Sequence, residues 1–107
     1  MDDDRIRIEE LMQKHRGSAI KRGGTFYFAQ SLAIALIREA QLEGLGIGLI
    51  DAFFLTDTTT QPSMEDSVDF ITYGTPDRSE PYDYAYKLVG DPSRRDMFFE
   101  IILCPLE

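Results

Sequence analysis

Two carboxylates interrupt stretches of this 107-residue sequence that are otherwise apolar. Asp51 stands within GLGIGLIDAFFL, and Glu100 stands within MFFEIILC. If these stretches form neighbouring strands in register, the two acids share one site. Paired carboxylates whose pKa values are separated carry out acid–base hydrolysis, so Asp51 and Glu100 are the candidate catalytic pair.

The same pattern also has a structural explanation. A carboxylate on the solvent-facing side of a sheet, or one that faces a basic side chain, looks the same in sequence. The basic residues considered as partners are Arg5, Arg7 and Arg38. We prefer this interpretation and predict a protein that is not an enzyme. A small hydrolase that uses Asp51 and Glu100 is the alternative.

Other reactive groups are few. One cysteine, Cys104, excludes an intramolecular disulfide, and the single histidine, His15, excludes a site rich in His or Cys ligands for zinc. Cys104 ends an apolar stretch, where cysteine usually packs as a small hydrophobe. A group of nearby acids lacks the spacing of an EF-hand, so no metal ion is predicted. These acids are Asp57, Glu65, Asp66 and Asp69.

The glycines of GLGIG, at Gly44, Gly46 and Gly48, invite comparison with a dinucleotide-binding loop. Such a loop follows a strand and opens a helix, so that the phosphate meets the helix N-terminus. Here a helical pattern comes first and a strand pattern follows. The glycines are therefore expected to end the helix and to let backbones approach closely, and no cofactor is predicted.

Acidic and aromatic residues occur together in two later segments, MEDSVDF and EPYDYAYK. Tyrosine beside negative charge is typical of interfaces with basic proteins. On a helix Tyr82 and Tyr86 share a face and Tyr84 points away, which leaves one of these sets for the core. The predicted partner-binding residues are Glu65, Asp66, Asp69, Tyr82, Asp83 and Tyr86.

The net charge of −8 is unevenly distributed. Residues 1–45 contain seven acids and seven bases, whereas residues 46–107 contain twelve acids and four bases. A surplus of negative charge repels phosphate backbones and attracts basic partners. We therefore expect a basic protein partner and no nucleic acid. An acidic composition that serves only solubility is the alternative explanation.

The hydrophobic pattern predicts an α+β fold. The predicted helices are 4–15, 25–43 and 79–90, and the predicted strands are 47–55, 67–74 and 97–104. Residues 16–24 are expected to be a connector and residues 56–66 a polar loop. We expect a single two-layer domain over 1–107. In it a long central helix packs on a small mixed sheet of three or more strands, beside two shorter helices.

No apolar run approaches the roughly 18 residues that a membrane span requires, so no membrane partner is expected. The N-terminal segment MDDDRIRIEE starts with acids, unlike a secretory signal, and a cytoplasmic location is predicted. The wide apolar arc of the helix 25–43 supports a third hypothesis, an oligomeric structural protein such as a homodimer.

LGIGLIDAFFL, the later QPSMEDSVDF and the final FFEIIL together resemble a pattern in small acidic immunity proteins of bacterial polymorphic toxin systems. The resemblance covers roughly residues 45–103, and KHRGSAIKRGG has no counterpart in it. It implies a cytosolic inhibitor without catalytic activity that binds a basic toxin. The corresponding residues are Gly46, Asp51, Phe53, Gln61, Pro62, Ser63, Glu65, Asp69, Phe99 and Glu100.

Overall fold

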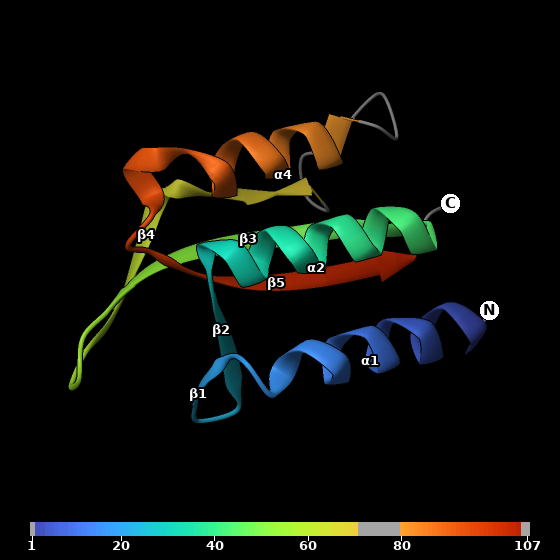
Figure 1. Ribbon diagram of the computed structural model, residues 1–107, viewed down its shortest axis with the longest axis horizontal. Helices are drawn as coiled ribbons and strands as arrows, with labels where there is room; N and C mark the ends of the chain where they lie inside the picture. Colours follow the sequence, from blue (N-terminus) through green and yellow to red (C-terminus); the bar gives the residue numbers. More distant parts are fainter. Residues whose placement is uncertain (1, 71–79, 106–107) are drawn as a thin grey trace.

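Antiparallel strands form one sheet, and helices pack on one of its faces (Figure 1). The computed structural model describes residues 2–70 and 80–105. In this part of the chain the strands are β1 (Ile20–Arg22), β2 (Thr25–Ala29), β3 (Leu45–Leu55), β4 (Thr60–Asp69) and β5 (Phe98–Pro105). The helices are α1 (Asp2–Arg16), α2 (Gln30–Glu43) and α4 (Glu80–Gly90), with a short 3-10 helix, η1 (Pro92–Arg94), before β5. The predicted α+β class is confirmed.

The sheet differs from the expected one in size and direction. Its strand order is β1-β2-β5-β3-β4, and every paired neighbour is antiparallel, so the prediction of a mixed sheet is wrong. The extra strands come from two segments that were predicted to be irregular. β1 lies in the expected connector 16–24, and most of the expected loop 56–66 belongs to β4.

The predicted helix 25–43 is wrong over its first five residues, because TFYFA forms β2. Aromatic and β-branched side chains favour a strand there, and pairing with β1 and β5 stabilises it. α2 therefore has 14 residues and is slightly shorter than α1, which has 15. It ends as predicted at Gly44, whose φ of 72° is the left-handed conformation that glycine adopts at little cost.

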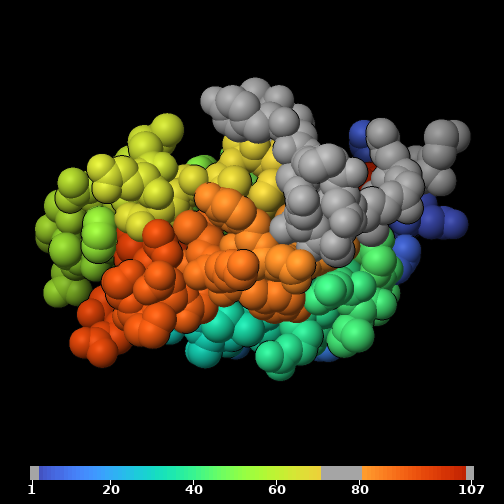
Figure 2. Space-filling model, turned by 90° about the horizontal axis from the view of Figure 1, so that it is seen from above, coloured from blue at the N-terminus to red at the C-terminus, as the bar shows by residue number. Residues whose placement is uncertain are grey.

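The core lies between the sheet and the helices. Alternate residues of β3 and β5 face it, among them Ile50, Phe99 and Ile101. α2 packs against both α1 and α4, and Figure 2 shows the side chains of α4 between those of β4 and α2. Fully burying a side chain such as Phe99 contributes about 1.5–3 kcal/mol. The other buried contributors include Leu11, Phe28, Ala33, Leu36, Ile37, Ala40, Ala52, Tyr82 and Val89.

The opposite side of the sheet carries the remaining alternate residues, and we call it the open face. Its members follow from the strand register: Tyr27, Leu49, Asp51, Phe53, Asp69, Phe98, Glu100 and Ile102. None of these described residues belongs to the hydrophobic core cluster, although Tyr27 is itself buried. The buried side chains of α1, α2 and α4 lie on the other side of the sheet. Two chemically different faces are thus separated by one layer of strands.

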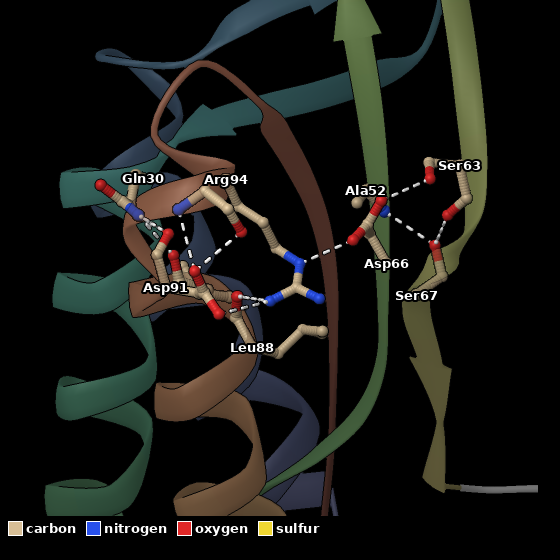
Figure 3. A network of polar contacts seen from close by, with 10 residues as sticks. Gln30, Ala52, Ser63, Asp66, Ser67, Leu88, Asp91 and Arg94 are labelled. Carbon is tan, nitrogen blue, oxygen red and sulfur yellow. Dashed lines mark hydrogen bonds and ion pairs between the residues drawn. The ribbon is translucent and has the colours of Figure 1, made fainter.

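β4 carries a large bulge at residues 64–67. Ile50 of β3 pairs with Val68, and Ala52 pairs with Ser63. Residues 64–67 of β4 therefore loop out of the regular pairing. The Ser67 hydroxyl donates to the carbonyl of Ser63 (2.7 Å) and accepts from the backbone N–H of Ala52 (2.9 Å). A serine side chain therefore replaces the missing backbone partner and holds the bulge in one geometry (Figure 3).

A network centred on Arg94 connects this bulge to the segment between α4 and β5 (Figure 3). The Nε of Arg94 donates to a carboxylate oxygen of Asp66 at 2.7 Å, and a second guanidinium nitrogen donates to the Leu88 carbonyl at 3.3 Å. The Ser63 hydroxyl donates to Asp66 at 2.6 Å. These bonds hold the pKa of Asp66 below its usual value, the Ser63 bond most strongly.

Three further expectations concern the ends of elements and the membrane. The predicted strand 67–74 is described only to residue 70, where β4 has ended at Asp69, and its remainder lies outside the described residues. The helix predicted over 79–90 is confirmed from Glu80, whereas Ser79, its expected cap, is also outside them. Within the described chain, no helix combines the length and apolar character needed to cross a bilayer.

Candidate protein-binding face

Asp51 and Glu100 are opposite one another on neighbouring strands. β3 and β5 pair antiparallel, and their register places Asp51 directly across from Glu100 on the open face. Directly opposed residues have Cβ atoms about 4.5–5.5 Å apart. Asp69 of β4 is opposite Leu49, two residues from Asp51, and so lies on the same face. The sheet therefore gathers carboxylates from three strands.

The electrostatics of this group are unfavourable. Burial raises the pKa of Asp51, and the charge of Asp69 raises it further. Burial likewise raises the pKa of Glu100, with the charge of Asp51 as the second cause. No hydrogen bond or ion pair joins Asp51 or Glu100 to another described side chain, and the arginine partners considered from sequence are not found there. Among described residues, Arg7 instead pairs with Asp4 and Glu43.

Apolar side chains surround the carboxylates on the open face. Tyr27 and Phe53 make an edge-to-face contact with ring centroids 4.9 Å apart, although they come from β2 and β3. Leu49 is opposite Ile102, whose side chain is 45% exposed. The open face thus combines an exposed apolar residue with half-buried carboxylates.

Arg22 closes one end of this region. Its guanidinium donates to the carbonyls of Thr56 and Thr59 and to the hydroxyl of Thr60, the last two at 2.7 and 2.9 Å. The β1–β2 hairpin is thereby bonded to the turn that joins β3 to β4. We call this contact the Arg22 clasp. It adds charge-assisted hydrogen bonds between two hairpins that β5 already joins within one sheet.

The predicted partner-binding residues of β4 have different environments. Glu65 is exposed within the bulge. Asp66 is bonded to Ser63 and Arg94, as described above, and so has a structural role. Asp69 lies on the open face near Asp51. The three acids therefore do not form one continuous group.

The predicted residues of α4 are likewise divided. Tyr82 is buried, and its hydroxyl donates to the carbonyl of Leu45, which begins β3. The Tyr86 hydroxyl bonds to the side-chain oxygen of Gln41 at 2.8 Å, and burial raises the pKa of both tyrosines. Asp83 is exposed. The expectation that one set of tyrosines packs inward is confirmed for Tyr82, which offers little accessible surface to a partner.

The ion pairs join residues within the same part of the chain, either the first 45 residues or the later part. Those of the first 45 residues join bases and acids of that same part: Arg7–Asp4, Arg7–Glu43, Lys14–Glu39, His15–Glu39 and Arg16–Glu9. Those of the later part are Arg94–Asp66, Arg94–Asp91 and Arg95–Asp96. Among the residues that the structure describes, these pairs join no base of the first 45 residues to an acid of the later part.

The other sequence candidates have structural positions. Nε2 of His15 lies 3.4 Å from a carboxylate oxygen of Glu39, between α1 and α2. Cys104 is on β5 opposite Gly46. Among the residues described, no group of three or more His, Cys, Asp or Glu side chains is arranged to hold a metal ion.

Sequence reasoning missed Arg22, Tyr27 and Ile102. The signal for Tyr27 and Ile102 is alternation: in TFYFA and FFEIIL every second residue belongs to the same face. Arg22 lies in neither stretch. Because TFYFA leads directly into a strong helical pattern and was predicted as the start of that helix, the sequence does not connect Tyr27 with Phe53. No protein-family model, curated protein or solved structure matches this chain.

Proposed function

We propose that this protein is a non-enzymatic binding module of the inhibitor type, which neutralises a basic protein partner in the cytoplasm. The observation that carries the proposal is the uncompensated negative charge of the later part of the chain. Three of the seven Lys and Arg residues of the first 45, namely Arg7, Lys14 and Arg16, pair with acids of their own segment. The negative electrostatic potential of the later part would attract a positively charged partner.

An inhibitor of a basic protein benefits from this arrangement. Negative potential raises the rate of encounter with a positively charged surface and disfavours acidic competitors. A nuclease is one kind of basic target, because its substrate is anionic and carboxylates can occupy the positions of phosphates. The resemblance to immunity proteins of toxin systems agrees with this proposal.

A peptide-display selection with the full chain as bait tests the proposal and does not require an identified partner. We expect the enriched peptides to be more basic than the starting library. Their binding should weaken as salt rises, because exposed charges are screened beyond about 8 Å at physiological ionic strength. Enriched peptides no more basic than the library, or affinities independent of salt, would contradict the proposal.

Charge removal supplies a matched control for that selection. Glu65→Gln with Asp83→Asn removes two exposed carboxylates from the acidic part, and Asp3→Asn with Glu10→Gln removes two from the neutral part. The first double variant should weaken binding of the enriched peptides more than the second. Equal losses would mean that net charge alone, and not its location, governs binding.

A small hydrolase remains the second candidate, favoured by the opposition of Asp51 and Glu100 on one face. The pKa of each of these two carboxyl groups is raised, as is expected of a general acid. A panel of chromogenic glycosides and esters tests it. Turnover that disappears in Asp51→Asn and in Glu100→Gln, and persists in Asp83→Asn, would support the hydrolase over the binding module.

A further inference from the structure

We propose that the open face is the docking surface for the basic partner, and that the partner places an arginine over Asp51 and Glu100 with an apolar side chain against Ile102. This inference rests on the proposed function and specifies its surface and ligand chemistry. It differs from the surface predicted from sequence, which was centred on β4 and α4. The two surfaces differ in how far the fold already occupies their polar groups.

Three of the six residues predicted from sequence are used within the fold. Asp66 is bonded to Arg94, and Tyr86 is bonded to Gln41. Tyr82 is only 6% exposed. A partner could use these groups only by displacing existing bonds, which costs free energy.

Asp51 and Glu100 are in the opposite situation. They face one another across β3 and β5, are half-buried, and have no bond to a described side chain. Like charges directly opposite in a sheet destabilise it. A cation placed between them would relieve that repulsion as well as form new bonds, so binding there has a free-energy gain that other exposed acids do not offer.

The geometry favours arginine over lysine. The guanidinium is planar and offers several N–H donors in a fixed fork, so one group can bond two neighbouring carboxylates. It also tolerates desolvation and packs against aromatic rings, and the half-buried ring of Phe53, which contacts the buried Tyr27, belongs to the same face. The exposed side chain of Ile102 then supplies the apolar contact beside the charged one.

The occupant is therefore a segment of a basic protein that presents arginine and apolar residues together. Charge complementarity argues against a second copy of this chain, because a net charge of −8 on each copy opposes self-association. The same sign of charge argues against nucleic acid. Arginine next to an apolar residue is the simplest chemistry that satisfies both the carboxylates and Ile102.

NMR titration of the isotopically labelled full chain tests this inference directly. The probe is a short peptide that alternates arginine and leucine, compared with a peptide of the same length in which citrulline replaces arginine. We expect shifts concentrated at Leu49, Asp51, Glu100 and Ile102, and binding at least about tenfold weaker with citrulline. Shifts centred on α4, or equal binding of the two peptides, would overturn the inference.

Two double variants of identical charge change complete the test. Asp51→Asn with Glu100→Gln should weaken binding of the arginine peptide by about tenfold or more, whereas Asp83→Asn with Glu65→Gln should have a smaller effect. The reverse order would move the docking surface to β4 and α4 and overturn the inference, although the proposed function would stand. If the display selection enriches no basic peptides, the proposed function itself fails.

Discussion

Asp51 on β3 stands directly opposite Glu100 on β5, on the side of the sheet away from the helices. Burial raises the pKa of both carboxyl groups, and their mutual repulsion adds to it for Glu100. Both groups therefore oppose folding when they are charged. The fold tolerates this electrostatic cost, which has measurable consequences for stability.

The double substitution Asp51→Asn with Glu100→Gln is expected to stabilise the protein at neutral pH by about 0.2–1 kcal/mol, the usual range of a cross-strand pair interaction. A raised folded-state pKa means that the native state holds these protons more tightly than the unfolded chain does. The two carboxyl groups therefore contribute to the free energy of unfolding below the ordinary carboxyl pKa. This contribution is lost as pH rises through the folded-state pKa. Urea denaturation at neutral pH measures the difference.

The same measurement in acid provides the control. Below the ordinary carboxyl pKa values, where wild-type Asp51 and Glu100 are protonated in both states, the advantage of the double variant should disappear. A variant that is less stable than wild type at neutral pH would show that these carboxylates make a stabilising contact.

Arg94→Ala should destabilise the protein by about 1–3 kcal/mol, because it leaves a charged, hydrogen-bonded partner, Asp66, without its guanidinium. Both side chains are less than a quarter exposed, at 21% and 23%. Arg95→Ala is the matched control, since Arg95 is 77% exposed and 4.0 Å from Asp96. Its effect should stay within about 0.5 kcal/mol. Equal effects would contradict a structural role for the network.

The Arg94 network also predicts a response to acid. The pKa of Asp66 is lowered by Ser63 and Arg94, so its stabilising contribution is present above the ordinary aspartate pKa and is lost as pH falls through the folded-state value. In Arg94→Ala this carboxyl should titrate closer to the ordinary value. NMR titration of Asp66 in both proteins measures the shift, and an unchanged titration would mean that Ser63 alone accounts for it.

Tyr82→Phe separates a folding role from a binding role. The hydroxyl is buried and donates to the Leu45 carbonyl, so its removal should cost about 1–2 kcal/mol of stability. It should leave binding of basic peptides unchanged. Tyr84→Phe is the control, because Tyr84 is 52% exposed and its hydroxyl should contribute little. Thermal denaturation and peptide titration of both variants provide the two measurements.

Arg22→Ala should loosen the turn between β3 and β4 while leaving the core intact. Without the Arg22 clasp, the carbonyls of Thr56 and Thr59 lose their charged donor, so amide exchange should accelerate across residues 56–60. Lys21→Ala, one residue away, leaves these bonds in place and serves as the control. Unchanged exchange in Arg22→Ala would show that the turn is held by its own threonines.

The parts of the fold that were predictable have strong local signals. α4 and β3 were located because Pro81 near a helix start and an apolar run after Gly44 specify those elements locally. The expectation that Asp51 and Glu100 share a site if their strands are adjacent and in register also held, since both strands are buried and pair along their length. Local pattern was sufficient where one interpretation dominated.

The failures come from segments whose structure depends on distant partners. TFYFA leads directly into a good helix, and only pairing with β1 and β5 makes it β2. Residues 56–66 are polar and contain Pro62, which favours a loop, yet β3 supplies a template for β4. The position of the candidate docking surface was missed for the same reason, because alternation in β2 and β5 becomes a face only once the strand order is known.

The bulge of β4 affects how copies of this protein behave in solution. β4 is an outer strand, and such strands offer unpaired backbone groups on which another chain can form a strand. Residues 64–67 break the line of those groups, and Pro62 has no N–H to offer. At the other edge β1 is only three residues long and carries Lys21 and Arg22. Both edges of the sheet therefore discourage strand pairing between molecules, which allows an exposed sheet to persist without aggregation.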